Sequence, residues 1–211
     1  MKSTKQKILD TSRQLFNDQG YGQVTIRMIA QALKMSSGNL NYHFRRREDI
    51  LEGLYFEMVA VFDARVQAVG DQPITLAYIE ANITSSMDRM IEYRFFWMDL
   101  HYLLKSNKKI RAHFERVKME RIKGYEFVFQ VLLRDDILHP PSFPREHELL
   151  INRMIDYSNT WLYASSLYEI EEKRNIIEEA SFSLMSMLYP YLTVAGQDTF
   201  RAIYPGNFPD E

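Results

Sequence analysis

The sequence predicts an all-α protein: a three-helix unit of helix-turn-helix type at the N-terminus and a helical bundle after it, about nine helices in total. Apolar residues recur at the three- and four-residue spacing of amphipathic helices, and valine, isoleucine and threonine do not alternate with polar residues over the length of a strand. Gly20, Gly70 and the prolines at 139–144 mark breaks between the helical segments.

The first three helices are placed by their caps and their apolar faces. The first runs from about Thr4 to Gln19 and ends before Gly20, which suits the left-handed residue that follows many helices. Thr25 and Ser36 have the hydroxyl side chains favoured at N-caps, so a short helix is predicted after each. The residues that face inward on these helices are Ile8, Leu15, Phe16, Ile26, Ile29, Ala30, Leu33, Leu40 and Phe44.

Six further segments with helical periodicity follow. Glu48 and Asp49 stand in the first turn of the next helix, where carboxylates complement the helix dipole. Successive prolines cannot continue a helix, so residues 139–144 are predicted to be a loop, and the tail after Gly196 is predicted to be irregular. The six helices are expected at about 48–69, 74–93, 95–104, 108–133, 146–168 and 173–192.

Charge is distributed unevenly along the chain. The net charge is −2 over 211 residues, yet residues 1–47 contain nine lysines and arginines against two aspartates, a balance of +7. A basic head on an acidic body is expected when one end meets nucleic-acid phosphates, although a solvated basic surface has the same pattern. The absence of cysteine excludes disulfides and cysteine-based zinc sites, and no signal peptide or membrane span is visible, so we expect a cytoplasmic protein.

Residues 24–44 have the composition of a helix-turn-helix that binds DNA. Two short helices are joined by three or four residues, and the second presents short polar and aromatic groups that suit base edges and phosphates. A helical hairpin inside a bundle could share this spacing, but it would not require a glycine and two asparagines beside three arginines. The candidate DNA-binding residues on the second helix and in the three arginines that follow it are Ser37, Gly38, Asn39, Asn41, Tyr42, His43, Arg45, Arg46 and Arg47.

The same stretch resembles the tetracycline-repressor (TetR) family over about residues 8–52. The resemblance is carried by two motifs, Leu15-Phe16-x-x-x-Gly20-Tyr21-x-x-Val24-Thr25 and Ile29-Ala30-x-x-x-x-Met35-Ser36-x-Gly38-x-Leu40-x-x-His43-Phe44, with Arg47 and acidic residues after them. It implies that Arg27, Ser37, Asn39 and Asn41 contact bases or grooves, and that Thr25, Tyr42, His43 and Arg47 contact phosphates.

Two positions depart from the family pattern. Lys34 stands where glycine is usual in the turn, so it is expected either to adopt a left-handed conformation at modest cost or to alter the turn, and it adds a charge that reaches phosphate. Asn41 replaces a tyrosine that typically packs on the DNA backbone and a thymine methyl. An amide at that position can read adenine, so the operator preference is expected to differ.

For the rest of the chain the resemblance implies a homodimeric repressor with a small-molecule effector pocket within 70–192. We therefore expect a DNA-binding domain at 1–47 and an effector-binding and dimerisation domain at 48–211, with the helix 48–69 as connector. Effector binding would change the spacing of two recognition helices, which must lie about 34–36 Å apart to enter successive major grooves of a palindromic operator. The last two helices carry apolar residues on more than one face, and the candidate dimer-interface residues are Met154, Tyr157, Trp161, Leu184 and Leu188.

The candidate effector-binding residues are aromatic rings, a histidine and one charge. Rings at helical spacing are also typical of a core. Arg121 falls on an otherwise apolar stripe. A charge there is unfavourable unless an anion, a hydrogen-bond acceptor or water compensates it. One interpretation is a salt bridge to an acidic, lipophilic effector; the other is an internal partner such as Asp99 or Glu92, or a side chain that extends to water. The candidates are Phe96, Trp97, His101, Arg121 and Tyr125.

Other function classes fit less well. The sequence has no P-loop, dinucleotide fingerprint, Gly-x-Ser-x-Gly or His-Glu-x-x-His motif, so we expect neither enzymatic activity nor a cofactor. His101, His113, His139 and His147 match no compact ligand spacing, so no metal site is expected. A helical carrier of a hydrophobic small molecule is the alternative function, but it leaves the basic head unexplained.

Overall fold

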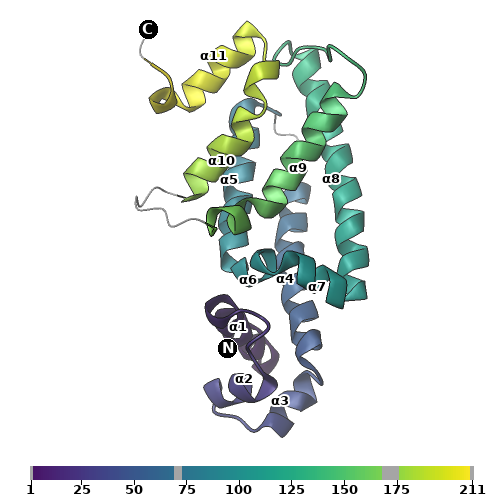
Figure 1. Cartoon of the computed structure of the whole chain (residues 1–211), viewed down its shortest axis with the longest axis vertical. Helices are drawn as coiled ribbons and strands as arrows, with labels where there is room; N and C mark the ends of the chain where they lie inside the picture. Colours follow the sequence, from purple (N-terminus) through teal and green to yellow (C-terminus); the bar gives the residue numbers. More distant parts are fainter. Residues whose placement is uncertain (1, 69–72, 168–175, 210–211) are drawn as a thin grey trace. The chain divides into compact units, whose positions relative to one another are not determined.

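The computed structural model describes residues 2–68, 73–167 and 176–209 (Figure 1). Within these ranges every regular element is helical, and the β interactions there amount to one isolated bridge between Leu138 and Leu192. The predicted all-α class is therefore confirmed. The chain divides into two compact units: unit 1 comprises Met1–Gly70 and Arg89–Phe114, and unit 2 comprises Asp71–Asp88 and Glu115–Glu211.

Unit 1 begins with the three predicted helices, α1 (Thr4–Gln19), α2 (Ile26–Ala32) and α3 (Ser37–His43), of which α2 packs on both others (Figure 1). Both predicted caps are confirmed: the Thr25 hydroxyl accepts a hydrogen bond from the Met28 amide at 3.3 Å, and the Ser36 hydroxyl accepts one from the Asn39 amide at 3.1 Å. Each cap satisfies an amide that would otherwise lack a partner at the helix start.

The turn between α2 and α3 contains Lys34, which stands where the TetR family usually has glycine. Lys34 has φ of 54°, so of the two alternatives expected at this position the left-handed conformation is the one present. The Lys34 amide donates to Gln31 O, and the Met35 amide donates to Ala30 O, both at 3.0 Å. These bonds fix the angle at which α3 leaves the turn, although a residue with a Cβ disfavours this backbone.

The remainder of unit 1 consists of α4 (Arg47–Ala68), two short helices, α6 (Arg94–Met98) and α7 (Leu100–Ser106), and the ends of two helices that continue into unit 2. The expected single helix over 95–104 is wrong, because the backbone turns at Asp99 (φ −103°, ψ 17°) and separates α6 from α7. The two shared helices are α5 (Leu76–Glu92) and α8 (Lys108–Arg134). The predicted break at Gly70 lies outside the described residues.

Unit 2 contains α9 (Glu146–Ser165) and α10 (Ile176–Ser186), which pack side by side (Figure 1). The predicted loop at 139–144 is confirmed, whereas the predicted start of the last helix at 173 lies outside the described residues. After α10 come a 3-10 turn, η1 (Tyr189–Tyr191), a helix, α11 (Val194–Ile203), and a second 3-10 turn, η2 (Pro205–Asn207).

The prediction of an irregular tail is wrong, since residues 194–203 form α11. Thr193 caps this helix by accepting the Gly196 amide at 3.1 Å. Gly196 itself is buried, and a Cβ built on it would lie 2.3 Å from Ile137 O, so this position requires glycine for close packing rather than for a loop. Phe200 anchors the helix among the rings of Phe182, Tyr189, Tyr204 and Phe208.

Candidate DNA-binding surface and ligand-binding residues

Helix α3 has an inward apolar face and an outward polar face. Leu40 is fully buried and Phe44 nearly so, which holds the helix against α2. Tyr42 is 85% exposed, the largest exposed fraction among the large apolar and aromatic side chains of the described residues. The other candidates on the outward side are exposed as well: Ser37, Gly38, Asn39 and Asn41, with His43 half-buried against the edge of Tyr42.

Cationic side chains border this polar face. Arg27 is exposed on α2, Lys34 is exposed in the turn, and Arg45 is exposed directly after α3. Arg46 is also exposed, although its guanidinium pairs with the Asp49 carboxylate at 3.3 Å. Arg27, Lys34, Arg45 and Arg46 are therefore all accessible to solvent, on α2 or within a few residues of an end of α3.

Arg47 is placed differently from the arginines before it. Its Nη1 donates to the carbonyl oxygens of Tyr21 at 3.0 Å, Gly22 at 3.3 Å and Val24 at 2.8 Å. The guanidinium also stacks 4.2 Å from the centroid of the Tyr21 ring. In the chain without DNA this side chain closes the turn between α1 and α2, a structural role that sequence reasoning missed because Arg47 was assigned to phosphate.

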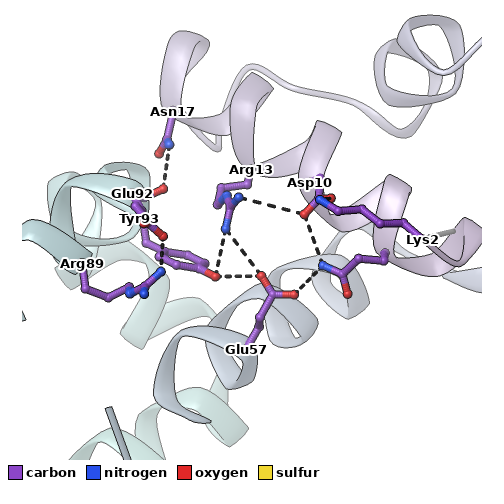
Figure 2. Close-up of polar contacts among 9 residues, drawn as sticks. Lys2, Asp10, Arg13, Asn17, Glu57, Arg89, Glu92 and Tyr93 are labelled. Carbon is purple, nitrogen blue, oxygen red and sulfur yellow. Dashed lines mark hydrogen bonds and ion pairs between the residues drawn. The ribbon is translucent and has the colours of Figure 1, made fainter. Parts of the chain in front are cut away.

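A polar cluster connects α1 with residues that come later in unit 1 (Figure 2). The Tyr93 hydroxyl donates to Glu57 at 2.7 Å and accepts from Arg13 Nη1 at 3.1 Å, while Arg13 and Glu57 are 3.6 Å apart. Gln6 donates to the other Glu57 oxygen at 2.8 Å. The cluster joins α1, α4 and the start of α6 within unit 1. Burial, then the bond to Glu57, raises the pKa of Tyr93 to about 12.

Further contacts connect the end of α1 with the beginning of α6. The Asn17 amide group donates to Glu92 O at 2.9 Å and accepts from the Phe95 amide at 3.1 Å. Arg94 Nε donates to Asn17 O at 3.0 Å, and its Nη2 pairs with Asp18 at 3.1 Å. The C-terminal half of α1, from Arg13 to Asp18, is therefore held by residues 92–95, which are remote in sequence.

The candidate effector-binding residues do not form one group within either unit. Phe96 and Trp97 are buried in unit 1, where their rings meet edge to face at 5.4 Å. Trp97 Nε1 is buried and has no hydrogen-bond partner among the described residues. His101 is exposed, and Tyr125 is half-buried on α8 one turn after Arg121.

Arg121 is half-buried in unit 2 and is held by neutral groups. Its Nη1 donates to Asn159 Oδ1 at 2.8 Å, and its Nη2 donates to Ser158 Oγ at 2.5 Å. Both acceptors lie on α9. The expectation of an internal partner is therefore confirmed, but the named examples, Asp99 and Glu92, are wrong: among the described residues α9 supplies a hydroxyl and an amide instead.

The candidate dimer-interface residues lie mainly inside the single chain. Met154, Trp161, Leu184 and Leu188 are at most 2% exposed without any second copy, and only Tyr157 is half-exposed. Their apolar faces are covered by the chain's own helices, so they lack the accessible area that an interface needs. The larger exposed apolar side chains on α9 and α10 are Leu149, Tyr163 and Ile176, and Leu167, just after α9, is exposed as well.

Unit 2 also has an open hollow of about 490 Å³ between α9 and residues 187–191, which follow α10. It is lined by Leu150, Arg153, Asp156, Met187, Pro190 and Tyr191, and none of these was an effector candidate. Among the described residues no group of three or more acidic or histidine side chains could hold a metal ion. The described helices include none that is both long and apolar enough to cross a membrane.

Comparison with known proteins agrees with this architecture. A family model described as "Bacterial regulatory proteins, tetR family" matches residues 8–54, and one described as "Bacterial transcriptional repressor" matches residues 57–200. The negative transcriptional regulator IcaR of the biofilm operon icaADBC of Staphylococcus epidermidis is 22% identical over 193 residues, 87% of this chain and 97% of that protein.

Solved structures show the same fold. A TetR-family transcriptional regulator from Marinobacter aquaeolei superposes with a TM-score of 0.86 at 26% identity, covering 97% of this chain and 98% of that one. A regulator from Saccharomonospora viridis in complex with choline has a TM-score of 0.66 at 18% identity, covering 90% and 97%. With the two family matches spanning most of the sequence, this chain belongs to the TetR family and is a helix-turn-helix, DNA-binding transcriptional regulator.

Proposed function

We propose that this regulator is a repressor that binds a palindromic operator as a homodimer and is released when a small molecule binds its larger domain. The observation that carries the proposal is the outward face of α3, where Tyr42 is 85% exposed beside exposed asparagines and bordered by cations. The description of the family match over 57–200 and the negative role of IcaR support repression rather than activation.

On this proposal the exposed residues divide by chemistry. Asn39 and Asn41 have amides that can pair with an adenine edge in the major groove, and Ser37 and Gly38 allow close approach. Charged and hydroxyl groups fix the helix on the backbone without reading sequence. Arg27 would meet bases or a groove, and phosphates would be met by Thr25, Lys34, Tyr42, His43, Arg45 and Arg46. Arg47 donates to three carbonyl oxygens and supports the turn between α1 and α2.

The two domains are proposed to have separate roles. Residues 1–47 are proposed to meet DNA, while 48–211 bind the effector and form the dimer, with α4 as connector and no enzymatic step. We propose that the second copy packs on exposed apolar side chains of α9 and α10, namely Leu149, Tyr163 and Ile176, and on Leu167, which follows α9. A protein of this kind acts in the cytoplasm, beside the chromosome.

The test is selection of bound sites from a pool of random duplex DNA at moderate salt. We expect enrichment of a palindrome whose half-sites lie about one or more helical turns apart, bound by two chains. Asn41→Ala should alter the enriched sequence, and Gln31→Ala, at an exposed position on α2, should not. Weak binding that vanishes as salt rises, with no enrichment, would contradict the proposal and favour a carrier of hydrophobic molecules.

A further inference from the structure

Arg121 has the surroundings of an anion-binding side chain. It lies half-buried on α8, one turn from Val117 on one side and from Tyr125 on the other, and both neighbours are themselves half-buried. An arginine side chain stays ionised inside proteins, so its positive charge must be balanced by anions or hydrogen-bond acceptors, or solvated by water. Burial beside apolar groups makes that requirement stronger, because a low-dielectric environment penalises an unpaired charge.

The partners that the chain supplies are neutral. Ser158 Oγ donates its own hydrogen to Ile155 O at 2.8 Å, so it meets Arg121 as an acceptor only. Asn159 accepts through Oδ1, which leaves the Asn159 Nδ2 hydrogens without an acceptor among the described residues. No carboxylate in the described part of the chain lies within ion-pair distance of Arg121.

Other arginines show that this arrangement is not general in the protein. Half-buried Arg13 and Arg89 have carboxylate partners, Glu57 and Glu92. Half-buried Arg47 has neutral partners, but three carbonyl oxygens and a stacked ring enclose it. Arg121 has two neutral oxygens for five N–H groups, so at least three donors are available, with an amide NH₂ beside them.

We infer that Arg121 and Asn159 form the anchor for an effector that carries a single carboxylate on an apolar body. The inference rests on the proposed function, because it names the class of the proposed effector. A guanidinium offers two parallel N–H groups that match the two oxygens of a carboxylate, and a neutral amide adds a donor without a second charge. One cation answers one negative charge, and the half-exposed rings of Tyr125 and Tyr157 offer apolar surface for the rest of the molecule.

The experiment measures binding to the dimeric protein without DNA. Purified protein is titrated calorimetrically with saturated fatty acids of six to twelve carbons and with 3-phenylpropionate, each paired with its primary amide. We expect a carboxylate of this set to bind and its amide to bind at least about tenfold more weakly, because the amide lacks the charge. If no carboxylate binds, or if acid and amide bind equally, the inference is wrong.

Two substitutions test the anchor itself. Asn159→Asp places an internal carboxylate beside Arg121, so it should weaken carboxylate binding by about 10- to 100-fold without loss of stability. Asn152→Asp, on the same helix, is the matched control for charge and should bind as the wild type does. Arg121→Met should lose binding to a similar extent, with Arg116→Met, at an exposed position on α8, as its control. Unchanged binding in Asn159→Asp and Arg121→Met would overturn the inference.

Failure of this inference can be told apart from failure of the proposed function. Binding of the ligand-free wild type to its selected operator depends only on the proposed function. If the protein binds its operator but binds no carboxylate, the proposed repressor function is supported and the carboxylate anchor at Arg121 and Asn159 is refuted. If the protein binds carboxylates but no operator is found, the carboxylate anchor is supported and a carrier of hydrophobic molecules replaces the repressor as the proposed function.

Discussion

The Tyr93 hydroxyl donates a hydrogen bond of 2.7 Å to the Glu57 carboxylate, which joins α4 to the start of α6. Tyr93 is only 2% exposed and the Glu57 side chain 27%, so the bond is partly shielded from water, and hydrogen bonds to charged groups are stronger than neutral ones. Arg13 on α1 reaches both residues. The position of the first helix is therefore set by a pair of residues that lie outside the helix-turn-helix.

Removal of the Tyr93 hydroxyl should destabilise unit 1 in a pH-dependent way. Tyr93→Phe should lower the free energy of unfolding by roughly 1.5–3 kcal/mol at pH 7. Because the pKa of Tyr93 is raised from 10.0 to about 12, its stabilising contribution is complete below pH 10 and is lost as pH rises toward 12. Urea unfolding at pH 7 and pH 11 should show the difference between wild type and variant shrinking at the higher pH. Tyr42→Phe, at an exposed ring, is the control, and equal losses at both pH values would refute the account.

The left-handed turn at Lys34 predicts a difference between two neutral substitutions. Lys34→Gly and Lys34→Ala remove the same charge, but only alanine retains a Cβ at φ of 54°. The glycine variant should therefore be the more stable by about 1 kcal/mol in urea unfolding. Equal stability of the two variants would mean that the turn is not strained.

Arg45 and Arg47 should respond in opposite ways to the same change. Arg47→Met removes the bonds to three carbonyl oxygens and should lower the free energy of unfolding by roughly 1.5–3 kcal/mol. Arg45→Met should leave stability within about 0.5 kcal/mol of wild type, since Arg45 is exposed. On the proposed function it should also reduce the salt dependence of operator binding by about one unit of log–log slope. An unaltered slope would remove Arg45 from the phosphate contacts.

Two glycines should have opposite responses to alanine. Gly196→Ala would force a Cβ to within 2.3 Å of a backbone oxygen, so it should destabilise the protein by about 1–3 kcal/mol. Gly124 lies within α8, where an added Cβ meets nothing within 4 Å, and Gly124→Ala should stabilise by about 0.5–1 kcal/mol. Thermal unfolding of both variants checks the pair, and a stable Gly196→Ala would contradict the close packing of α11.

Local signals in the sequence were sufficient for the helix-turn-helix. Hydroxyl caps at Thr25 and Ser36 depend on neighbours within a few residues, so the order of residues predicts them, whereas the special position of Lys34 followed from the resemblance to the TetR family. The outward face of α3 was equally predictable, because helical periodicity separates Leu40 and Phe44 from Asn39 and Asn41.

Contacts between distant segments could not be predicted in this way. Glu57 and Tyr93 are 36 residues apart, and the sequence around either residue does not indicate that the other is its hydrogen-bond partner. Similarly, apolar residues on two faces of α9 showed that both faces are covered but not by what, and Met154 and Trp161 turn out to be buried by their own chain. Gly196 was mistaken for a loop residue because sequence does not distinguish a turn from a close approach.

The bonds from Asn17 and Asp18 to residues 92–95 bear on how these regulators can be recombined. A chimaera that transplanted only residues 1–47 onto a relative would leave behind the partners of Arg13, Asn17 and Asp18, and its first helix would meet foreign side chains. The natural unit of exchange is discontinuous in sequence, since residues 89–114 belong with 1–70. A new operator specificity is better introduced by substitutions on α3 alone, which leave these bonds in place.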